Sequence, residues 1–451
     1  MPTFFYAILQ RCNLSFYVMI EILYKHYLIS RQVTTDSRNC PPNSIYFALK
    51  GERFNGNNFA LDAISKGCAI AVVDDVSLKG KKGCFWVPDT LQALQQLAAY
   101  HRRCSEVKVI AITGSNGKTT TKELLAQVLS KKFNIWFTQG NLNNHIGVPL
   151  TILSMPKGTE LLVVEMGANH GGEIAELCFI SDPDLGLVTN VGKAHIEGFG
   201  SIEGVKKAKG ELYDYLKQKG GTIFISWDNK HLKDMLGDSY NNVFKYGSSM
   251  SNHVIGEDIS VDPYLKFKWR KNIKESYFIV DTHLTGIYNL ENALAAISVG
   301  VFFKVADFDI NNAICCYYPA NHRSQIVETD NNRVILDAYN ANPASMSVAL
   351  DNFIALKGDK RVLIIGGMKE LGNESKQEHL LLLNRIDSIE SDLVFLIGEE
   401  FKDLAPDNSG YLWFDSVQSL IPYLNTHPLD GCFILVKGSR SNMLEKVMTA
   451  L

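Results

Sequence analysis

The sequence predicts an α/β protein with three domains: a small N-terminal α/β domain, a central domain whose mostly parallel sheet carries a phosphate loop, and a C-terminal Rossmann-like domain. Three observations support this prediction. The chain has 451 residues, more than one hydrophobic core usually serves. Short apolar runs alternate with segments of helical periodicity, as in sheets covered on both faces. A glycine-rich motif, TGSNGKTTT (113–121), follows an apolar run and precedes a helical one.

The composition is that of a globular chain and excludes several classes of protein. Hydrophobic residues make up 46% and charged residues 21% of the chain, without a long Pro, Ser or Gly tract. The 45 Lys and Arg nearly balance the 48 Asp and Glu, so the chain offers no basic surface for nucleic acid. The nine cysteines are scattered and never spaced as CxxC, which suits reduced thiols. We therefore expect a cytoplasmic protein.

The first twenty residues are apolar enough to raise the question of a signal peptide or a membrane anchor. Arg11 and Asn13 interrupt the run, and no charged n-region or small-residue cleavage site frames it. We expect an N-terminal appendage over 1–18 and no stable membrane insertion, with a signal peptide as the alternative. Met19 precedes a short amphipathic pattern and is an alternative start.

The apolar runs place domain boundaries near residues 105 and 325. The first domain, 19–105, has runs at 44–51 and 69–75 around a helical segment at 59–67. The central domain, 106–325, begins with the β-branched run VKVIAIT, and its polar, alternating stretch at 250–285 predicts an antiparallel extension of the sheet. Its further apolar runs lie at 161–167, 184–192 and 221–226.

The C-terminal domain, 326–451, repeats the alternation of apolar runs and helices that is typical of a Rossmann-like fold. Its sequence lacks a GxGxxG motif, so its topology alone does not imply a dinucleotide. Its apolar runs lie at 333–339, 361–367, 393–398 and 432–438.

The motif at 113–121 has the setting of a phosphate loop. Its glycines let backbone N–H groups approach phosphate oxygens, and the N-terminus of the next helix favours negative charge. Lys118 would meet the β- and γ-phosphates, and Thr119 would ligate magnesium. Because position 112 is Ile, the spacing is shorter than in GxxxxGK[ST]. A glycine-rich turn that caps an ordinary helix is the alternative.

The shorter loop resembles the nucleotide loop shared by Mur ligases and folylpolyglutamate synthetases. From about residue 33 onward, further motifs similar to those of the Mur ligase family follow in the family's order: GNLNNHIGVPLTIL (140–153), EMGAN (165–169), TNVGKAHIEGFGS (189–201), AKGELY (208–213), GIYNLENALAA (286–296), DAYNANPASM (337–346) and LVKGSR (435–440). The resemblance assigns ATP binding to the loop residues Gly114, Ser115, Asn116, Gly117, Lys118, Thr119 and Thr120.

Three residues outside the loop are candidate magnesium ligands, together with Thr119. Glu165 ends an apolar run, where an unpaired buried carboxylate would be costly and a cation is the natural remedy. The resemblance implies that Glu165 and His195 bind magnesium near the γ-phosphate. It also implies that Lys209 is carbamylated by carbon dioxide and offers magnesium a hard oxygen ligand. Without the resemblance, His195 is an ordinary histidine and Lys209 is a solvated helix residue.

Four further positions are candidates for the nucleotide. Asn289 and Asn292 share a helix face and could contact adenine, although an N-cap and a polar helix face are the alternatives. The resemblance assigns Arg323 and Asp337 to the nucleotide, whereas an exposed arginine is the alternative for Arg323. Asp337 ends an apolar run, at the edge where open α/β sheets bind ligands. Lys437 and Ser439 are two further candidates to face phosphate. Asn340 and Asn342 could instead shape a turn before Pro343.

The motifs TTDSR (34–38) and ALKGERFNGNNF (48–59) resemble the family's pocket for a uridine nucleotide. The sequence departs from the family at 55–57, where relatives often have a DGH-like run, at Tyr288, where many have His, and at Ser226, where many have Asn. The candidate ligands of the UDP-substrate are Ser37, Arg38, Lys50, Asn141 and Asn144.

The resemblance implies a ligase that uses ATP and Mg²⁺ to activate a carboxylate as an acyl phosphate, which an amine then attacks. Three motifs, including GGMKELG (366–372), are similar to those of the member that joins D-alanyl-D-alanine to UDP-N-acetylmuramoyl-tripeptide in peptidoglycan precursor synthesis. We expect a monomer, hinged near the domain boundaries, that binds ATP between its second and third domains. The alternatives are another Mur ligase, a folylpolyglutamate synthetase, and a non-catalytic nucleotide-binding regulator.

Overall fold

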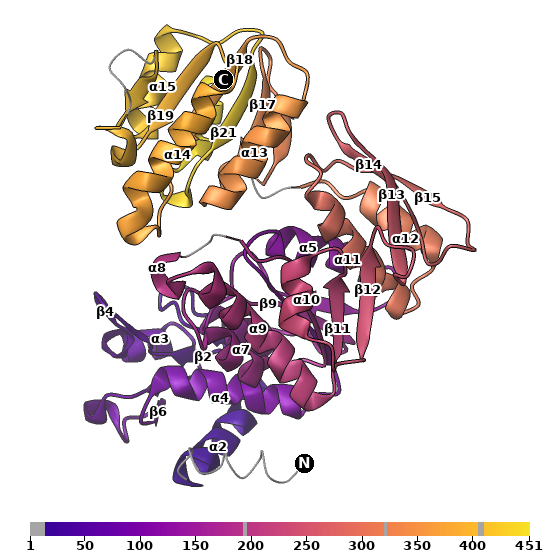
Figure 1. The fold of residues 1–451 in the computed structure, drawn as a ribbon. Coiled ribbons are helices and arrows are strands. Elements are labelled where there is room, and N and C mark those ends of the chain that lie inside the picture. The colour runs from indigo at the N-terminus through magenta and orange to yellow at the C-terminus, as the bar shows by residue number, and fades with distance from the viewer. Residues whose placement is uncertain (1–13, 193–195, 320–322, 405–409) are drawn as a thin grey trace. The chain divides into compact units, whose positions relative to one another are not determined.

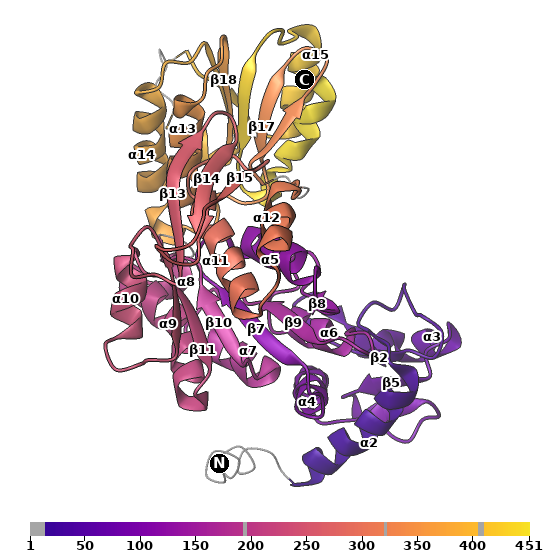
Figure 2. The ribbon, with the colours of Figure 1, turned by 90° about the vertical axis from the view of Figure 1, so that its right-hand side faces the viewer.

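The structure of the chain is a computed structural model that describes residues 14–192, 196–319, 323–404 and 410–451. The described residues divide into two compact units, and Figures 1 and 2 label most of their elements. The first unit contains the described residues up to Ala111, together with Phe133–Ala168 and Gly172–Gly186. The second contains Ile112–Lys132, Asn169–Gly171 and the described residues from Leu187 onward.

A small parallel sheet with helices forms the N-terminal part of the first unit. The strand order among the described residues is β1-β2-β5-β6, and all three pairings are parallel. The side chain of Asp89 caps the long helix α4 by accepting a hydrogen bond from Gln92 N. The elements are α2 (Leu14–Ser30), β1 (Val33–Thr34), β2 (Ile45–Phe47), β3 (Lys50–Gly51), β4 (Phe54–Asn55), α3 (Ala60–Ser65), β5 (Ile70–Val73), β6 (Cys84–Trp86) and α4 (Thr90–Arg103).

Strands β7 to β15 form a larger sheet with the order β15-β14-β13-β12-β11-β10-β7-β9-β8 among the described residues. The pairing of β13 with β14 and of β14 with β15 is antiparallel, which confirms the extension predicted over 250–285. The strands are β7 (Lys108–Thr113), β8 (Ile135–Phe137), β9 (Leu161–Glu165), β10 (Leu185–Val188), β11 (Thr222–Ser226), β12 (Val243–Gly247), β13 (Val254–Val261), β14 (Leu265–Arg270) and β15 (Phe278–Asp281).

The helices that accompany this sheet include α5, which begins at Lys118 directly after the predicted phosphate loop. Within the second unit, α5 packs against α11 and α12. The helices are α5 (Lys118–Leu129), α6 (Gly147–Leu153), α7 (Glu173–Ser181), α8 (Ile196–Phe199), α9 (Ile202–Lys219), α10 (Lys230–Leu236), α11 (Asn289–Phe302) and α12 (Asp307–Cys315).

The C-terminal sheet has the order β16-β17-β21-β18-β19-β20 and is parallel except for the β16–β17 pair. One hydrophobic cluster joins the sheet to α13 and α14, and another joins it to α15 and the C-terminal turn. Figure 1 shows these three helices beside the sheet. The elements are β16 (Gln325–Glu328), β17 (Arg333–Asp337), α13 (Pro343–Ala355), β18 (Arg361–Gly366), α14 (Ser375–Asp387), β19 (Leu393–Ile397), β20 (Leu412–Phe414), α15 (Val417–Thr426) and β21 (Phe433–Lys437).

The predicted fold class is confirmed, because each predicted domain has its own sheet flanked by helices. The predicted boundaries at 18, 105 and 325 remain predictions, and the first of them falls inside α2. Among the described residues, no helix has both the length and the apolar character that a membrane span requires.

Candidate active site

The predicted phosphate loop connects buried strand β7 to helix α5. Its two glycines have positive φ angles, +142° at Gly114 and +78° at Gly117. A Cβ atom at Gly114 would lie 2.0 Å from Thr189 Oγ1, and one at Gly117 would lie 2.5 Å from Asn292 Oδ1. Both positions therefore need glycine for conformation and for space. The loop is therefore packed closely against its neighbours and ends at the N-terminus of α5, where backbone N–H groups favour an anion.

Hydrogen bonds from the segment after β10 fix the middle of this loop. The backbone oxygen of Asn116 accepts from Thr189 Oγ1 at 2.6 Å and from Asn190 Nδ2 at 3.1 Å. The backbone N–H of Asn116 donates to Asn190 Oδ1 at 3.0 Å. The hydroxyl of Ser115 hydrogen bonds to the backbone of Gly192. The TNVG motif thus supports the loop, a role that its sequence alone did not reveal.

The lysine of the loop folds back over it. Lys118 Nζ donates to the backbone oxygens of Gly114 at 2.7 Å and Ser115 at 3.2 Å. Thr119 is buried in the first turn of α5, whereas Thr120 is half-buried. An ammonium group within the curve of a glycine loop is suited to stabilise negative charge on a transferred phosphoryl group.

Glu165 ends β9 and is 1% exposed, as expected for the last residue of a buried run. Its Oε1 accepts a hydrogen bond of 2.8 Å from Asn143 Nδ2. Two neighbouring asparagines are the predicted UDP-substrate contacts: Asn144 Oδ1 accepts from the backbone of Ile146 and Gly147 at the start of α6, and Asn141 is exposed. Asn143 is therefore the residue that the sequence analysis missed. Its signal was present in the NLNN motif, but residue type did not identify which asparagine faces Glu165.

Of the other predicted metal ligands, Lys209 lies in α9 and is 2% exposed, so it is not a solvated helix residue. Its Nζ lies 5.1 Å from the centre of the Phe199 ring. By contrast, Lys206 forms an ion pair with Glu203 at the surface. His195 lies outside the described residues. The described residues contain no group of three or more His, Cys, Asp or Glu side chains that could hold a metal ion.

The amides of Asn289 and Asn292 are buried and hydrogen bonded inside the protein. Asn292 Oδ1 accepts from Thr121 Oγ1 at 3.0 Å, and Asn292 Nδ2 donates to Asn289 Oδ1 at 2.9 Å. Asn289 Nδ2 donates to the backbone oxygen of Thr285 at 2.8 Å. The two residues share a helix face as predicted, and that face contacts α5, the helix after the loop.

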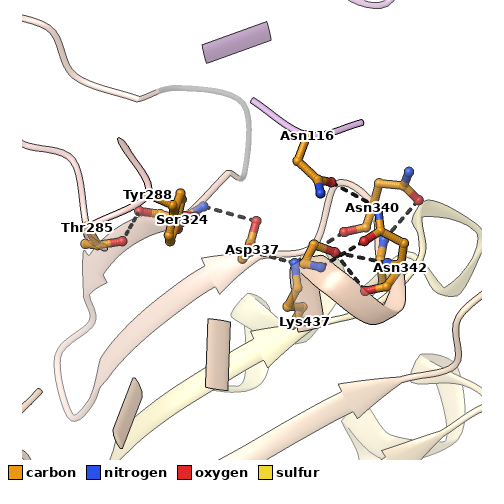
Figure 3. Close-up of polar contacts among 10 residues, drawn as sticks. Asn116, Thr285, Tyr288, Ser324, Asp337, Asn340, Asn342 and Lys437 are labelled. Atoms are coloured by element: carbon orange, nitrogen blue, oxygen red, sulfur yellow. Dashed lines mark hydrogen bonds and ion pairs between the residues drawn. The ribbon is translucent and has the colours of Figure 1, made fainter. Parts of the chain in front are cut away.

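Asp337 and Lys437 lie at the carboxyl ends of strands, whereas Arg323 precedes β16 and Asn342 precedes α13. Asp337 ends β17, and its Oδ2 accepts a hydrogen bond of 2.6 Å from Lys437 Nζ at the end of β21 (Figure 3). Arg323 stacks on the ring of Tyr339, with 3.7 Å between the guanidinium carbon and the ring centre. Asn342 caps α13 and donates a hydrogen bond of 3.0 Å to Asn116 Oδ1 in the phosphate loop.

The predicted uridine-nucleotide pocket contains two charge pairs. The guanidinium of Arg38 donates two hydrogen bonds of 2.9 Å to the carboxylate of Asp36, and these bonds lower the pKa of Asp36 to about 2. Lys50 pairs with Asp74 at 3.0 Å.

Two buried residues of the same region have structural contacts. Asn57, in the run where the family often has other residues, donates to Asp74 and accepts from the backbone of Asp74 and Asp75. The backbone oxygen of Ser37 accepts from Lys66 Nζ at 3.1 Å. Asn57 therefore supports the fold of this region, and Arg38 and Lys50 present the accessible cations.

The residues of the phosphate loop and Glu165 fit a nucleoside triphosphate and a divalent cation by the chemistry of their donors and acceptors. The loop has the crowded glycines and helix N-terminus of a phosphate cradle. The buried carboxylate of Glu165 is a hard oxygen ligand of the type that magnesium prefers.

Three family profiles match successive parts of the chain. They are described as the Mur ligase family catalytic domain (residues 30–102), the Mur ligase middle domain (112–300) and the Mur ligase glutamate ligase domain (322–440). Together they cover most of the chain, including the phosphate loop, Glu165 and Asp337.

Proteins of similar sequence and structure match over nearly the full length. The UDP-N-acetylmuramoyl-tripeptide–D-alanyl-D-alanine ligase of Bacillus subtilis is 35% identical, with 93% of this chain and 92% of the relative covered. The protein of the same name from Escherichia coli is 34% identical, with 93% of each covered. A crystal structure of MurF from Acinetobacter baumannii superimposes with a TM-score of 0.83 at 30% identity, covering 93% of this chain and 92% of that one. MurF ligase from Thermotoga maritima, solved in complex with ADP, gives a TM-score of 0.82 at 27% identity, covering 94% and 97%.

Proposed function

Because the chain belongs to the Mur ligase family, we propose that it joins D-alanyl-D-alanine to UDP-N-acetylmuramoyl-tripeptide with ATP and Mg²⁺, as a step of peptidoglycan precursor synthesis. The observation that carries this proposal is the phosphate loop, whose glycines have no room for a Cβ atom, in a chain that matches ligases of this name over 93% of its length.

In the proposed reaction, a carboxylate oxygen at the end of the tripeptide attacks the γ-phosphorus of ATP, and ADP leaves. The amine of D-alanyl-D-alanine then attacks the carbonyl carbon of the acyl phosphate, loses a proton, and expels phosphate. Lys118 and the loop N–H groups stabilise the charge of the transferred phosphoryl group. Catalysis is otherwise a matter of holding the reacting groups together and excluding water from the acyl phosphate.

We assign the magnesium ions to Thr119, Glu165, His195 and a carbamylated Lys209, and the nucleotide to residues 114–120, Asn289, Asn292, Arg323 and Asp337. When bound, magnesium supplies positive charge beside the phosphates. The support for Glu165 is the burial of its carboxylate at the end of β9, where its Oε1 accepts a hydrogen bond from Asn143 Nδ2. The support for Lys209 is its burial, which sets it apart from its neighbours Lys206 and Lys207.

The UDP-substrate is assigned to the N-terminal sheet, with Ser37, Arg38, Lys50, Asn141 and Asn144 as candidate contacts. Arg38 supports this assignment because its guanidinium is accessible, with 88% of the side chain exposed. We further propose that the protein acts in the cytoplasm as a monomer and binds no nucleic acid, consistent with its net charge of −3. Gel filtration of the purified chain tests the monomer.

Phosphate release tests the activity most directly. The purified full chain is assayed with ATP, Mg²⁺ and UDP-N-acetylmuramoyl-tripeptide, with and without D-alanyl-D-alanine. We expect sustained release only when both substrates are present. Release that ignores the dipeptide would contradict the proposed acceptor and favour another ligase of the family. A chain that binds ADP and releases no phosphate with any acceptor would instead be a regulator.

A further inference from the structure

A line of buried hydrogen bonds begins at the helix that follows the phosphate loop. Thr121 Oγ1 donates to Asn292 Oδ1 at 3.0 Å, and Asn292 Nδ2 donates to Asn289 Oδ1 at 2.9 Å. Asn289 Nδ2 then donates to the backbone oxygen of Thr285 at 2.8 Å. Each bond ends on a residue that supplies the next, so the first three bonds connect α5 to the segment before α11.

Three more bonds extend this line into the C-terminal sheet. Thr285 Oγ1 donates to the backbone oxygen of Ser324 at 3.0 Å, and Ser324 N–H donates to Asp337 Oδ1 at 3.2 Å. Lys437 Nζ donates to Asp337 Oδ2 at 2.6 Å (Figure 3). We call these six bonds the relay. All of its residues belong to the second compact unit.

The relay residues on the phosphate-loop side are buried. Thr121 and Thr285 are 0% exposed, and Asn289 and Asn292 are 3% and 5% exposed. A buried donor or acceptor that loses its partner has no water to replace it, so each bond of the relay constrains the next. A displacement at one end is therefore resisted along the whole line.

Ser324 is the point at which the relay enters the C-terminal sheet. It has a φ of +49°, which is uncommon for a residue other than glycine and persists only where the surroundings hold it. Its N–H and C=O are both in the relay, and its hydroxyl lies 2.5 Å from the hydroxyl of Tyr288. The N–H, C=O and hydroxyl groups of Ser324 are thus all hydrogen bonded, and these bonds hold its conformation.

At its other end, the relay contacts the phosphate loop through Asn292. Asn292 Oδ1 lies so close to Gly117 that a Cβ atom added there would be only 2.5 Å from it. Gly117 is the last residue before α5. A change in the loop at Gly117 must therefore move Asn292 or be opposed by it.

We propose that Asn292, Asn289, Thr285 and Ser324 are positioning residues, which hold the Asp337–Lys437 pair in a geometry set by the phosphate loop. Nucleotide binding at the loop then strengthens the hydrogen bond from Ser324 N–H to Asp337. The inference rests on the proposed function, because it gives this coupling to the nucleotide of that reaction. A contiguous line of packed, hydrogen-bonded groups is a physical carrier for such coupling, and by linkage the coupling acts in both directions.

Thr285→Val tests the relay because valine keeps the branched shape and removes the hydroxyl that reaches Ser324. Thr282→Val is the matched control: Thr282 is 1% exposed, and its hydroxyl donates to the backbone oxygen of Leu265 at 2.8 Å, within the central sheet. Thr285→Ser restores the donor and separates loss of the bond from a change in packing.

Hydrogen exchange of the full chain, with and without Mg²⁺ and ADP, gives the readout. The amide of Ser324 is itself a relay donor, so peptides that contain it report the bond to Asp337 directly. We expect ADP to slow this exchange in the unaltered chain, in Thr282→Val and in Thr285→Ser. In Thr285→Val, the slowing should fall by about five-fold, the effect of one net hydrogen bond.

Equal slowing in Thr285→Val and Thr282→Val would overturn the relay while leaving nucleotide binding in place. ADP that slows exchange in peptides of 114–121 but not at Ser324 in the unaltered chain would overturn it as well. If ADP slows exchange at neither place, both the relay and the nucleotide site at the loop fail. Thermal unfolding of each variant confirms that the comparison is made between folded proteins.

Discussion

Asp337 and Lys437 stand directly opposite each other at the ends of the adjacent parallel strands β17 and β21, and the lysine Nζ lies 2.6 Å from Asp337 Oδ2. Only 15% of the aspartate side chain and 2% of the lysine side chain are exposed. A charge pair with so little access to water is costly to break from one side, because the remaining charge stays buried without its partner.

Removing Lys437 alone should therefore destabilise the fold. We expect Lys437→Met to lower the free energy of unfolding by about 3 kcal/mol, and Asp337→Asn in the same chain to recover much of the loss. Lys206→Met is the control: its partner Glu203 is 72% exposed, and such surface pairs contribute at most about 1 kcal/mol. Urea unfolding of the three variants measures the difference. Equal losses in Lys437→Met and Lys206→Met would contradict the buried pair.

Lys118→Ala should abolish ligation and leave the fold intact. The ammonium is held by two backbone oxygens of the loop, so its removal takes away a positioned charge rather than a packing group. Loss of one such contact with the transferred phosphoryl group typically costs about a hundredfold or more in turnover. Phosphate release and thermal unfolding are measured together, with the exposed Lys131→Ala as control. Near-normal turnover in Lys118→Ala would refute the phosphate loop.

Asn143→Ala should raise the magnesium concentration that the reaction requires. Asn143 holds Glu165 Oε1 through a hydrogen bond of 2.8 Å, and partners that orient a metal ligand are typically worth about ten-fold or more in metal affinity. The adjacent Asn144→Ala removes the acceptor for two backbone N–H groups at the start of α6, so it should lower stability without changing this requirement. Turnover measured against magnesium concentration separates the two. Identical magnesium curves would count against the role of Asn143.

Most elements could be predicted from the sequence because each long buried strand corresponds to an apolar run. Strands β7, β17 and β18 are examples. The runs for β17 and β18 were predicted as the first two strands of the C-terminal domain. The short edge strands β16 and β20 were not predicted, because their residues are only partly buried and carry no continuous apolar signal.

The candidate site divides in a similar way. The phosphate loop was readable because its glycines follow from conformation and space at fixed positions in the chain. The pairing of Asn143 with Glu165 and the internal bonds of Asn289 and Asn292 depend on contacts between distant segments. Residue type and helical spacing alone cannot determine which partner an amide meets.

The stability of the first unit should depend on His101 in mild acid. Burial, followed by the nearby charge of Arg31, lowers the pKa of His101 to about 4 from its ordinary value of 6.5. As the pH falls from 6.5 toward 4, His101 is protonated in the unfolded chain but stays neutral in the folded chain. The contribution of neutral His101 to stability is therefore complete above pH 6.5 and is lost progressively as the pH falls toward 4. His101→Phe should flatten the fall in urea midpoint over this range, whereas His427→Phe, at an exposed position, should not. An unchanged slope in His101→Phe would refute this assignment.

Lys209 is the most demanding test of the proposed metal site. It is 2% exposed in α9, where a lysine ammonium beside magnesium would repel the metal. Carbon dioxide adds to the neutral amine to form a carbamate with loss of a proton, which replaces the cation with a hard anionic oxygen ligand. We therefore expect Lys209→Ala to lose activity and to regain part of it when acetate or another small carboxylic acid is added, because the acid supplies the missing carboxylate. Lys207→Ala, which removes an exposed lysine from the same helix, should keep full activity and show no response to the acid. Full activity of Lys209→Ala without any added acid would rule out the carbamate, since the magnesium ion would then need no ligand from this position.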